Sequence, residues 1–138
     1  EIDLNPVEDK SLKTETVSIE NLSILVVEDN EINMEVIEFM LQSEGAIVYK
    51  ARNGKEAVEQ FGQIKNLDLI LMDLMMPVMD GYEATLQIRK KDKKIPILAM
   101  SANAYMQDIQ KCYKTGMSGH ISKPLYLDDL KDRIVQIV

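Results

Sequence analysis

This sequence has only one cysteine, no long apolar run and no excess of basic residues. Its single cysteine, Cys112, cannot form an internal disulfide, so the chain does not require an oxidising compartment. The longest apolar runs are four residues, whereas a helix needs roughly 20 to cross a bilayer. The formal net charge of −7 disfavours nucleic-acid binding, which requires clustered Lys and Arg. We therefore expect no nucleic-acid partner and no direct membrane insertion.

What is present suits one domain with a buried core. The chain has 138 residues, of which 46% are hydrophobic and 28% charged, an ordinary balance for a globular protein. Residues 1–20 contain Pro6 and many acids without a regular apolar period. We predict a flexible tail or linker there, followed by one domain over residues 21–138. Because the chain starts with Glu1 rather than Met, we expect a fragment of a longer protein.

Strand-like and helix-like segments alternate after the tail. Short apolar runs predict strands at residues 24–27, 46–51, 69–72, 95–100 and 120–122. Apolar residues at helical spacing predict a helix after each strand, and Cys112 is expected to fill the core from the fourth of them. Apolar strands joined by helices are typical of a parallel sheet covered on both faces. We predict an α/β fold: a doubly wound, five-stranded parallel sheet with five helices on two faces.

Polar side chains follow four of the predicted strands. Glu28 and Asp29 follow the first, Asp73 the third, Ser101 the fourth and Lys123 the fifth. In such sheets ligands bind at the carboxyl ends of the strands, so we expect these side chains to converge. Three neighbouring carboxylates resist ionising together, and an all-oxygen ligand set suits Mg²⁺. The three negative charges would balance Mg²⁺ and one lysine.

Such a cluster indicates phosphoryl transfer. Asp73 is followed by an irregular loop through Pro77 and Gly81, which can bend around a metal and leave the carboxylate open. A carboxylate that attacks phosphorus forms an aspartyl phosphate, and Mg²⁺ with Lys123 would neutralise the transferring oxygens. Taken singly, the acids could be helix caps, Ser101 a turn residue and Lys123 a surface charge. Their occurrence together at four strand ends favours the chemistry.

The same strand ends resemble the receiver domains of two-component signalling. The matching segments are Val26-Val27-Glu28-Asp29-Asn30 with Asn33, Met72 through Asp73 to Gly81, Ser101-Ala102-Asn103-Ala104, and Ser122-Lys123-Pro124. The resemblance covers residues 21–138, and the motifs look most like receivers attached to hybrid sensor histidine kinases. It implies the flavodoxin-like strand order 2-1-3-4-5.

The resemblance implies a phosphoacceptor and a metal site. Asp73 would accept the phosphoryl group. Asp29 would bind Mg²⁺ directly and Glu28 through water, with Asp73 and the backbone carbonyl of Met75 as further ligands.

It also implies the residues around the phosphoryl group. Lys123 would bind that group, Ser101 would be the switch hydroxyl, and the Lys123–Pro124 peptide bond would be cis. Met75 and Asn103 would lie beside the phosphoryl group and influence its hydrolysis.

His120 departs from the family pattern. Receivers usually have Tyr or Phe three residues before the lysine, and this ring turns inward when the switch hydroxyl moves. Imidazole is smaller and more polar, and it can gain a proton near neutral pH. Two interpretations stay open: His120 is the switch partner of Ser101, or it is a surface histidine without a role.

The predicted function is that of a phosphorelay receiver. A histidine kinase or histidine phosphotransfer domain would be the phosphodonor, and phosphorylation would switch an interaction surface. The domain would catalyse only its own phosphorylation and dephosphorylation, within a parent that is a hybrid histidine kinase. We expect a cytoplasmic location, as a free protein or as the cytoplasmic part of a membrane-anchored kinase, and weak homodimerisation.

Two alternative functions compete with this one. The first alternative is a pseudo-receiver, a binding module of the same fold that is never phosphorylated; such relatives usually lose the phosphoacceptor, an acid or the lysine, and all are present. The second is an Mg²⁺-dependent phosphatase or a flavin-binding protein. Phosphatases of that kind carry Asp-x-Asp, whereas Leu74 and Met75 follow Asp73. A flavin phosphate would be repelled by Glu28 and Asp29.

Overall fold

Five parallel strands form the centre of the structure, a computed structural model that describes residues 18–102 and 106–138. Their order in the sheet is β2-β1-β3-β4-β5, which confirms the predicted topology. The strands are β1 (Ser23–Val27), β2 (Ile47–Ala51), β3 (Leu69–Asp73), β4 (Ile97–Ser101) and β5 (Gly119–Ser122). The helices between and after them are α2 (Glu31–Ser43), α3 (Gly54–Phe61), α4 (Gly81–Lys91), α5 (Met106–Thr115) and α6 (Leu127–Ile137).

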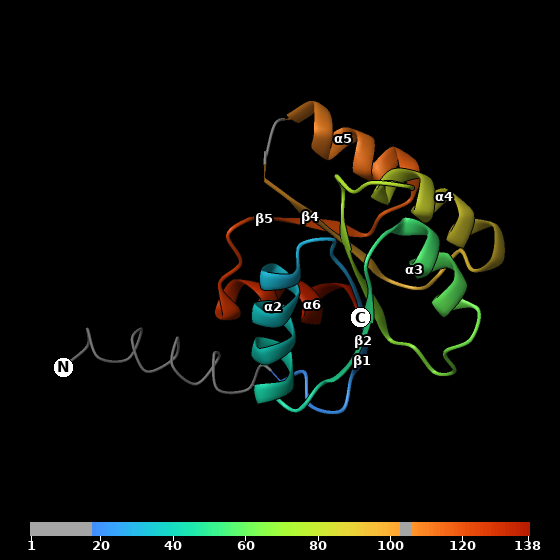
Figure 1. Ribbon diagram of the computed structural model, residues 1–138. Helices are drawn as coiled ribbons and strands as arrows, with labels where there is room; N and C mark the ends of the chain where they lie inside the picture. Colours follow the sequence, from blue (N-terminus) through green and yellow to red (C-terminus); the bar gives the residue numbers. More distant parts are fainter. Residues whose placement is uncertain (1–17, 103–105) are drawn as a thin grey trace.

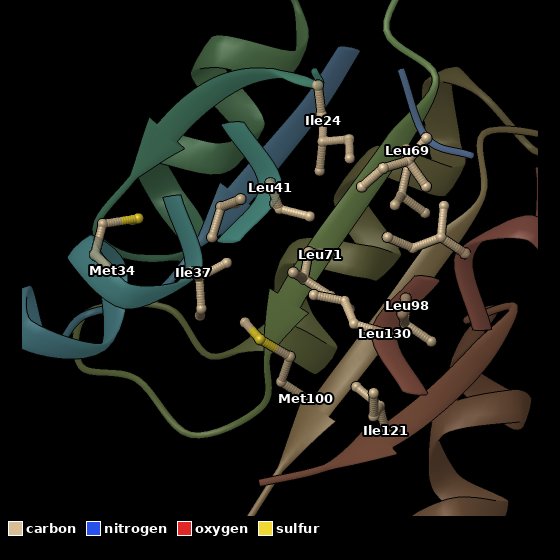
Figure 2. Close-up of a cluster of buried hydrophobic side chains, with 14 residues drawn as sticks. Ile24, Met34, Ile37, Leu41, Leu69, Leu71, Leu98, Met100, Ile121 and Leu130 are labelled. Atoms are coloured by element: carbon tan, nitrogen blue, oxygen red, sulfur yellow. The ribbon is translucent and has the colours of Figure 1, made fainter. Parts of the chain in front are cut away.

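Helices cover both faces of the sheet, as Figure 1 shows. Successive side chains of a strand point to opposite faces, and the core divides accordingly. Ile24 and Val26 of β1 pack with α2 and α6, in the cluster drawn in Figure 2. Leu25 and Val27 pack on the other face with α3, α4 and α5. Cys112 belongs to this second cluster, which confirms its predicted role as core filler.

Three helices begin directly beyond the carboxyl edge of the sheet because each has a polar N-cap. Asn30, Asn53 and Asp80 each accept a hydrogen bond from the backbone N–H three residues later, at 2.9 Å. Such caps satisfy amides that a helix start leaves unpaired. The cap of α2 comes straight after Glu28 and Asp29, so the first turn of α2 lies beside the predicted site.

The strand bounds lie within one residue of the predicted ones except at the start of the fourth strand, and packed structure begins before the predicted start of the domain. The fourth strand begins at Ile97, not Ile95, because Pro96 has no N–H to donate and the amide of Ile95 donates instead to Asp92 in a turn. Ile19 is fully buried in the first core cluster. The packed part of the chain therefore extends two residues before the predicted domain start at Asn21. Across the described ranges, no helix has the length and apolar character to cross a membrane.

Candidate phosphoacceptor site

Three carboxylates meet at the carboxyl edge of the sheet. Glu28 and Asp29 follow β1, and Asp73 ends β3, the strand paired with β1. One oxygen of each lies within 4.8 Å of the others. Glu28 and Asp73 are buried, whereas Asp29 is exposed at the rim. The register of two neighbouring parallel strands thus brings together acids that are 44 residues apart in the sequence.

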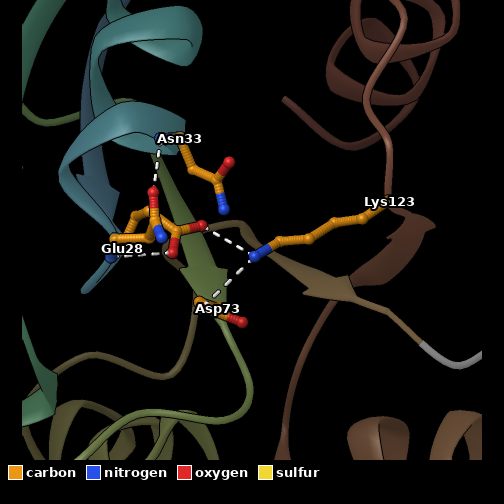
Figure 3. Close-up of polar contacts among 5 residues, drawn as sticks. Glu28, Asn33, Asp73 and Lys123 are labelled. Atoms are coloured by element: carbon orange, nitrogen blue, oxygen red, sulfur yellow. Dashed lines mark hydrogen bonds and ion pairs between the residues drawn. The ribbon is translucent and has the colours of Figure 1, made fainter.

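Lys123 reaches this cluster from the end of β5 (Figure 3). Its Nζ lies 2.7 Å from Glu28 Oε1 and 3.4 Å from Asp73 Oδ2. Burial by itself lowers the pKa of Lys123, but its hydrogen bond to Glu28 and the charges of Asp73 and Glu28 outweigh this, so the pKa is raised. The ammonium therefore stays charged at neutral pH and offsets one of the three negative charges.

The carboxyl group of Asp73 is hard to ionise here. Burial and the charge of Glu28 raise its pKa from 3.8 to about 6, while Lys123 opposes the rise. A partly uncompensated carboxylate in a closed site favours a bound cation. The donor set consists of carboxylate oxygens with Asp29 exposed at the rim, which fits a hard divalent cation such as Mg²⁺.

Asn30 holds Glu28 in place, a role that was not predicted from the sequence. Its backbone N–H donates to Glu28 Oε2 at 3.2 Å, while its side chain caps α2 through the amide of Asn33. Together with Lys123, this occupies both oxygens of Glu28. The sequence signal for this role is the position of Asn30, which directly follows the two acids and precedes Asn33 by three residues.

The loop after β3 passes close to the site. An added Cβ on Gly81 would overlap the backbone carbonyl oxygen of Asp73, so only glycine fits there. Val78 in this loop has φ of 69°, a left-handed conformation that β-branched residues avoid. Buried Thr85 donates from Oγ1 to the carbonyl of Gly81 at 2.8 Å and anchors the start of α4; the sequence offered no signal for it.

The remaining predicted residues lie around this cluster. Ser101 is the last residue of β4, the strand next to β3. Its backbone carbonyl oxygen accepts a hydrogen bond from the backbone N–H of Lys123, with an N–O distance of 2.8 Å. The Lys123–Pro124 peptide bond is cis. Met75 lies two residues after Asp73 with its side chain exposed. Asn103 falls outside the described residues.

His120 lies on β5, opposite Ala99 of β4. Its Nδ1 is buried and has no hydrogen-bond partner in the described parts of the chain. Burial, and then the charge of Arg133, lower the pKa of the imidazole. The guanidinium of Arg133 donates to the backbone carbonyl of His120 at 2.9 Å. The ring is therefore neutral at physiological pH, and its part in a switch stays a prediction.

Comparison with known proteins points to one family. A family model described as the response regulator receiver domain matches residues 24–135. Among curated relatives, a hybrid signal transduction histidine kinase from Dictyostelium discoideum (kinase L) is 36% identical over 118 residues, which is 80% of this chain and 7% of the kinase. Histidine kinase 5 of Arabidopsis thaliana is 32% identical over 94% of this chain. The chain spans 17% of that protein, so these relatives are much longer.

The fold of this chain is also similar to that of a solved receiver domain. The receiver domain of sensor histidine kinase PA1611 from Pseudomonas aeruginosa is 38% identical, with a TM-score of 0.78; the alignment covers 85% of this chain and 97% of that one. That structure has a magnesium ion coordinated in its active-site cleft.

Proposed function

Because this chain belongs to the response regulator receiver family of two-component signalling, we propose that it accepts a phosphoryl group from a phosphohistidine on Asp73. The observation that carries the proposal is the meeting of three acids and one lysine at the edge of the sheet. Glu28, Asp29, Asp73 and the backbone carbonyl of Met75 would hold Mg²⁺ there.

Asp73 suits the role of nucleophile better than its neighbours. Both oxygens of Glu28 are occupied, by Lys123 and by the amide of Asn30. Asp29 is exposed beside the start of α2, where a carboxylate is better placed to hold a cation. An oxygen of Asp73 would attack phosphorus as the bond from phosphorus to the donor imidazole breaks, and the imidazole would leave with the bonding electrons. The product is an acyl phosphate on Asp73.

Lys123 would stabilise the charge that moves in this step. Its Nζ already lies within reach of Asp73, so a short displacement would carry it from the acids to a phosphoryl oxygen. When bound, Mg²⁺ would neutralise further charge on the same oxygens. The hydroxyl of Ser101, at the next strand end, would donate a hydrogen bond to the phosphoryl group. With His120, it would pass the change on to β5.

The phosphodonor would be a histidine kinase or a histidine phosphotransfer protein. A structural neighbour supports this: the receiver domain of Ssk1 from Saccharomyces cerevisiae, in a co-crystal with the histidine phosphotransfer protein Ypd1, is 31% identical with a TM-score of 0.80, and the alignment covers 86% of this chain and 89% of that one. The domain would work in the cytoplasm. The parent would be a hybrid histidine kinase.

Intact mass after incubation with Mg²⁺ and acetyl phosphate tests the proposal. We expect the gain of one phosphoryl group, and borohydride trapping should place it on Asp73. Asp73→Asn should not be labelled. Lys123→Ala should be labelled slowly, and Ser101→Ala should be labelled without the structural response. A label on Asp29, or undiminished labelling of Asp73→Asn, would overturn the mechanism, and no labelling at all would favour a pseudo-receiver.

A further inference from the structure

Basic residues gather where α4 turns into β4. Residues 89–94 include five basic side chains in six positions, in a chain whose formal net charge is −7. Four of these side chains are exposed, and we call them the lysine corner: Lys90, Lys91, Lys93 and Lys94. None of the four forms an ion pair within the part of the chain that the structure describes. The lysine corner therefore presents unpaired positive charge to the solvent.

The other two charged residues of this segment build the turn itself. Asp92 Oδ1 accepts hydrogen bonds from the backbone N–H groups of Lys94 and Ile95, at 2.7 and 3.0 Å. Arg89 bonds to the backbone: its Nε donates to the carbonyl of Gly116 at 2.8 Å, and its Nη1 donates to the carbonyl of Asp92 at 3.1 Å. The acid and the arginine are thus engaged in structural bonds, while the lysines stay exposed on the turn that these bonds hold.

The neighbouring helices add further positive charge. α3, α4 and α5 cover one face of the sheet (Figure 1), and each ends at the amino edge, where the parallel strands begin. Lys65, in the loop after α3, and Lys114, in the last turn of α5, are also exposed. Cations near a helix C-terminus interact favourably with the helix dipole. That effect explains the lysines inside α4 and α5 but not Lys93 and Lys94, which follow the C-cap residue Asp92.

The lysine corner and the phosphoacceptor cluster lie at opposite edges of the sheet, with α4 between them. Gly81, the first residue of α4, packs against the carbonyl of Asp73, and Lys91 is the last residue of the helix. Its 11 residues span about 16 Å at a rise of about 1.5 Å each. This is about two Debye lengths at physiological ionic strength. The carboxylates of the cluster therefore do not cancel the attraction of the lysine corner for an anion.

The chemistry of this patch favours an anionic surface over a single bound anion. Its exposed cations are all lysines, and an ammonium is a compact, hydrated point charge without the planar fork by which arginine grips one phosphate or one base. Clusters of about four to eight basic residues bind anionic lipids by charge. A long nucleic acid would extend past the corner and meet the acids that give the chain its charge of −7, whereas a flat membrane touches the corner alone.

We propose that the lysine corner, together with Lys65 and Lys114, adsorbs to an anionic lipid surface without inserting into it. Each lysine near such a surface raises the partition coefficient about fivefold. With the corner on the membrane, the carboxyl edge of the sheet faces away from the lipid, and the phosphoacceptor cluster stays open to a partner in solution. This adsorption does not depend on the proposed phosphoryl transfer, and the unphosphorylated chain has it.

Cosedimentation with lipid vesicles tests the proposal. The chain should bind at low salt to phosphatidylcholine vesicles in which about a third of the lipid is phosphatidylserine, and equally well when phosphatidylglycerol supplies the same charge. It should not bind pure phosphatidylcholine. Raising the salt to about 0.5 M should release it, because screening shortens the reach of exposed charges.

Charge reversal identifies the residues that make the contact. Lys93→Glu should lower the partition coefficient on anionic vesicles about tenfold or more, since it removes an attraction and adds a repulsion. Lys55→Glu is the matched control: it changes the net charge equally at an exposed lysine in the first turn of α3, at the carboxyl edge of the sheet. It should stay within about twofold of wild type. Melting curves should show both variants folded, because both side chains are exposed.

Four outcomes would overturn the proposal. They are equal binding by Lys93→Glu and Lys55→Glu, no binding of the wild-type chain to either anionic vesicle, a strong preference for one anionic lipid at equal charge, and tighter binding to duplex DNA than to vesicles at the same salt. The third would indicate a headgroup pocket, and the fourth a nucleic-acid surface.

Labelling by acetyl phosphate in solution is measured alongside and keeps the two proposals apart. Because the lysine corner is remote from Asp73, Lys93→Glu should be labelled at the wild-type rate. A chain that binds anionic vesicles but is never labelled would overturn the proposed function and support the membrane surface. A chain that is labelled but does not bind would do the reverse.

Discussion

The carboxyl group of Asp73 shows how a site can oppose stability. Its pKa is raised from 3.8 to about 6 by burial and by the charge of Glu28. The folded protein therefore binds this proton more tightly than the unfolded chain does. Below about pH 4 both states are protonated and there is no cost, whereas above pH 6 the folded state must bear an unfavourable charge.

Replacing that charge should stabilise the metal-free protein. At about pH 7.5, Asp73→Asn is expected to raise the free energy of unfolding by about 1–3 kcal/mol relative to wild type. The gain should diminish as the pH falls through 6 towards 4, because the wild-type carboxyl becomes neutral. Urea denaturation at several pH values measures it, with exposed Asp132→Asn as control. A gain independent of pH would show that charge is not its cause.

Val78 is a second residue whose conformation costs free energy. Its φ is 69°, whereas the other non-glycine residues with positive φ in the described ranges are Asn21 and Asn66, a type that tolerates this region. Its side chain is 78% exposed, so little packing depends on it.

Val78→Gly should therefore raise the free energy of unfolding by about 1 kcal/mol, since relieved strain exceeds the extra freedom of glycine in the unfolded chain. Val36→Gly, at a half-exposed position in α2, is the counterpart in a helix, and it should lower that free energy by about 0.5 kcal/mol, the difference between the helix propensities of valine and glycine. Denaturant midpoints measure both. A destabilised Val78→Gly protein would show that the valine contributes packing in the loop.

At the scale of the elements, the segment before β1 belongs to the packed structure. Ile19 is fully buried in the cluster formed by α2, α6 and one face of the sheet. The amide of Asn21 donates to the carbonyl of Gly45, just past the end of α2, at 2.9 Å. The turn into β1 is thus held to the neighbouring helix at its C-terminal end.

Ile19→Ala should lower the free energy of unfolding by about 2–4 kcal/mol, the usual cost of truncating a buried isoleucine. Ser18→Ala, at an exposed neighbour, should change it by less than about 0.5 kcal/mol. Thermal or chemical unfolding compares the two. If Ile19→Ala and Ser18→Ala were equally stable, Ile19 would not belong to the folded core, and the domain would begin after residue 20 as predicted.

At the scale of the whole molecule, metal binding should couple to folding. The three carboxylates come from segments that meet only in the folded sheet, so a cation held by them binds the folded state and not the unfolded chain. Such a ligand stabilises the protein by about 2.7 kcal/mol when its concentration is a hundred times its dissociation constant.

Millimolar Mg²⁺ should accordingly raise the melting temperature, and a chelator should reverse the increase. Asp29→Ala should remove most of it, because Asp29 is the exposed carboxylate of the proposed metal site and its loss leaves the core intact. NaCl at equal ionic strength controls for screening. If Asp29→Ala kept the full response to Mg²⁺, the metal would lie elsewhere.

The order and type of the elements, and the polar groups at the strand ends, follow from the local sequence. The spacing of apolar residues along the chain distinguishes a strand from a helix. The position of Asp73 directly after an apolar run can likewise be read without knowledge of the fold. Motif resemblance supplied the strand order, which the structure confirms. Local pattern failed at Ile95, where the missing N–H of Pro96 delays the strand, and at Ile19, whose burial depends on helices far along the chain.

Contacts between polar groups, by contrast, depend on the three-dimensional fold. Lys123 and Glu28 are 95 residues apart, and their 2.7 Å contact depends on the stagger of the strands and on the length of the lysine side chain. The buried Nδ1 of His120 and the raised pKa of Asp73 likewise depend on what surrounds them. Burial and Coulomb energies are set by distances in space, and these exist only once the sheet has formed.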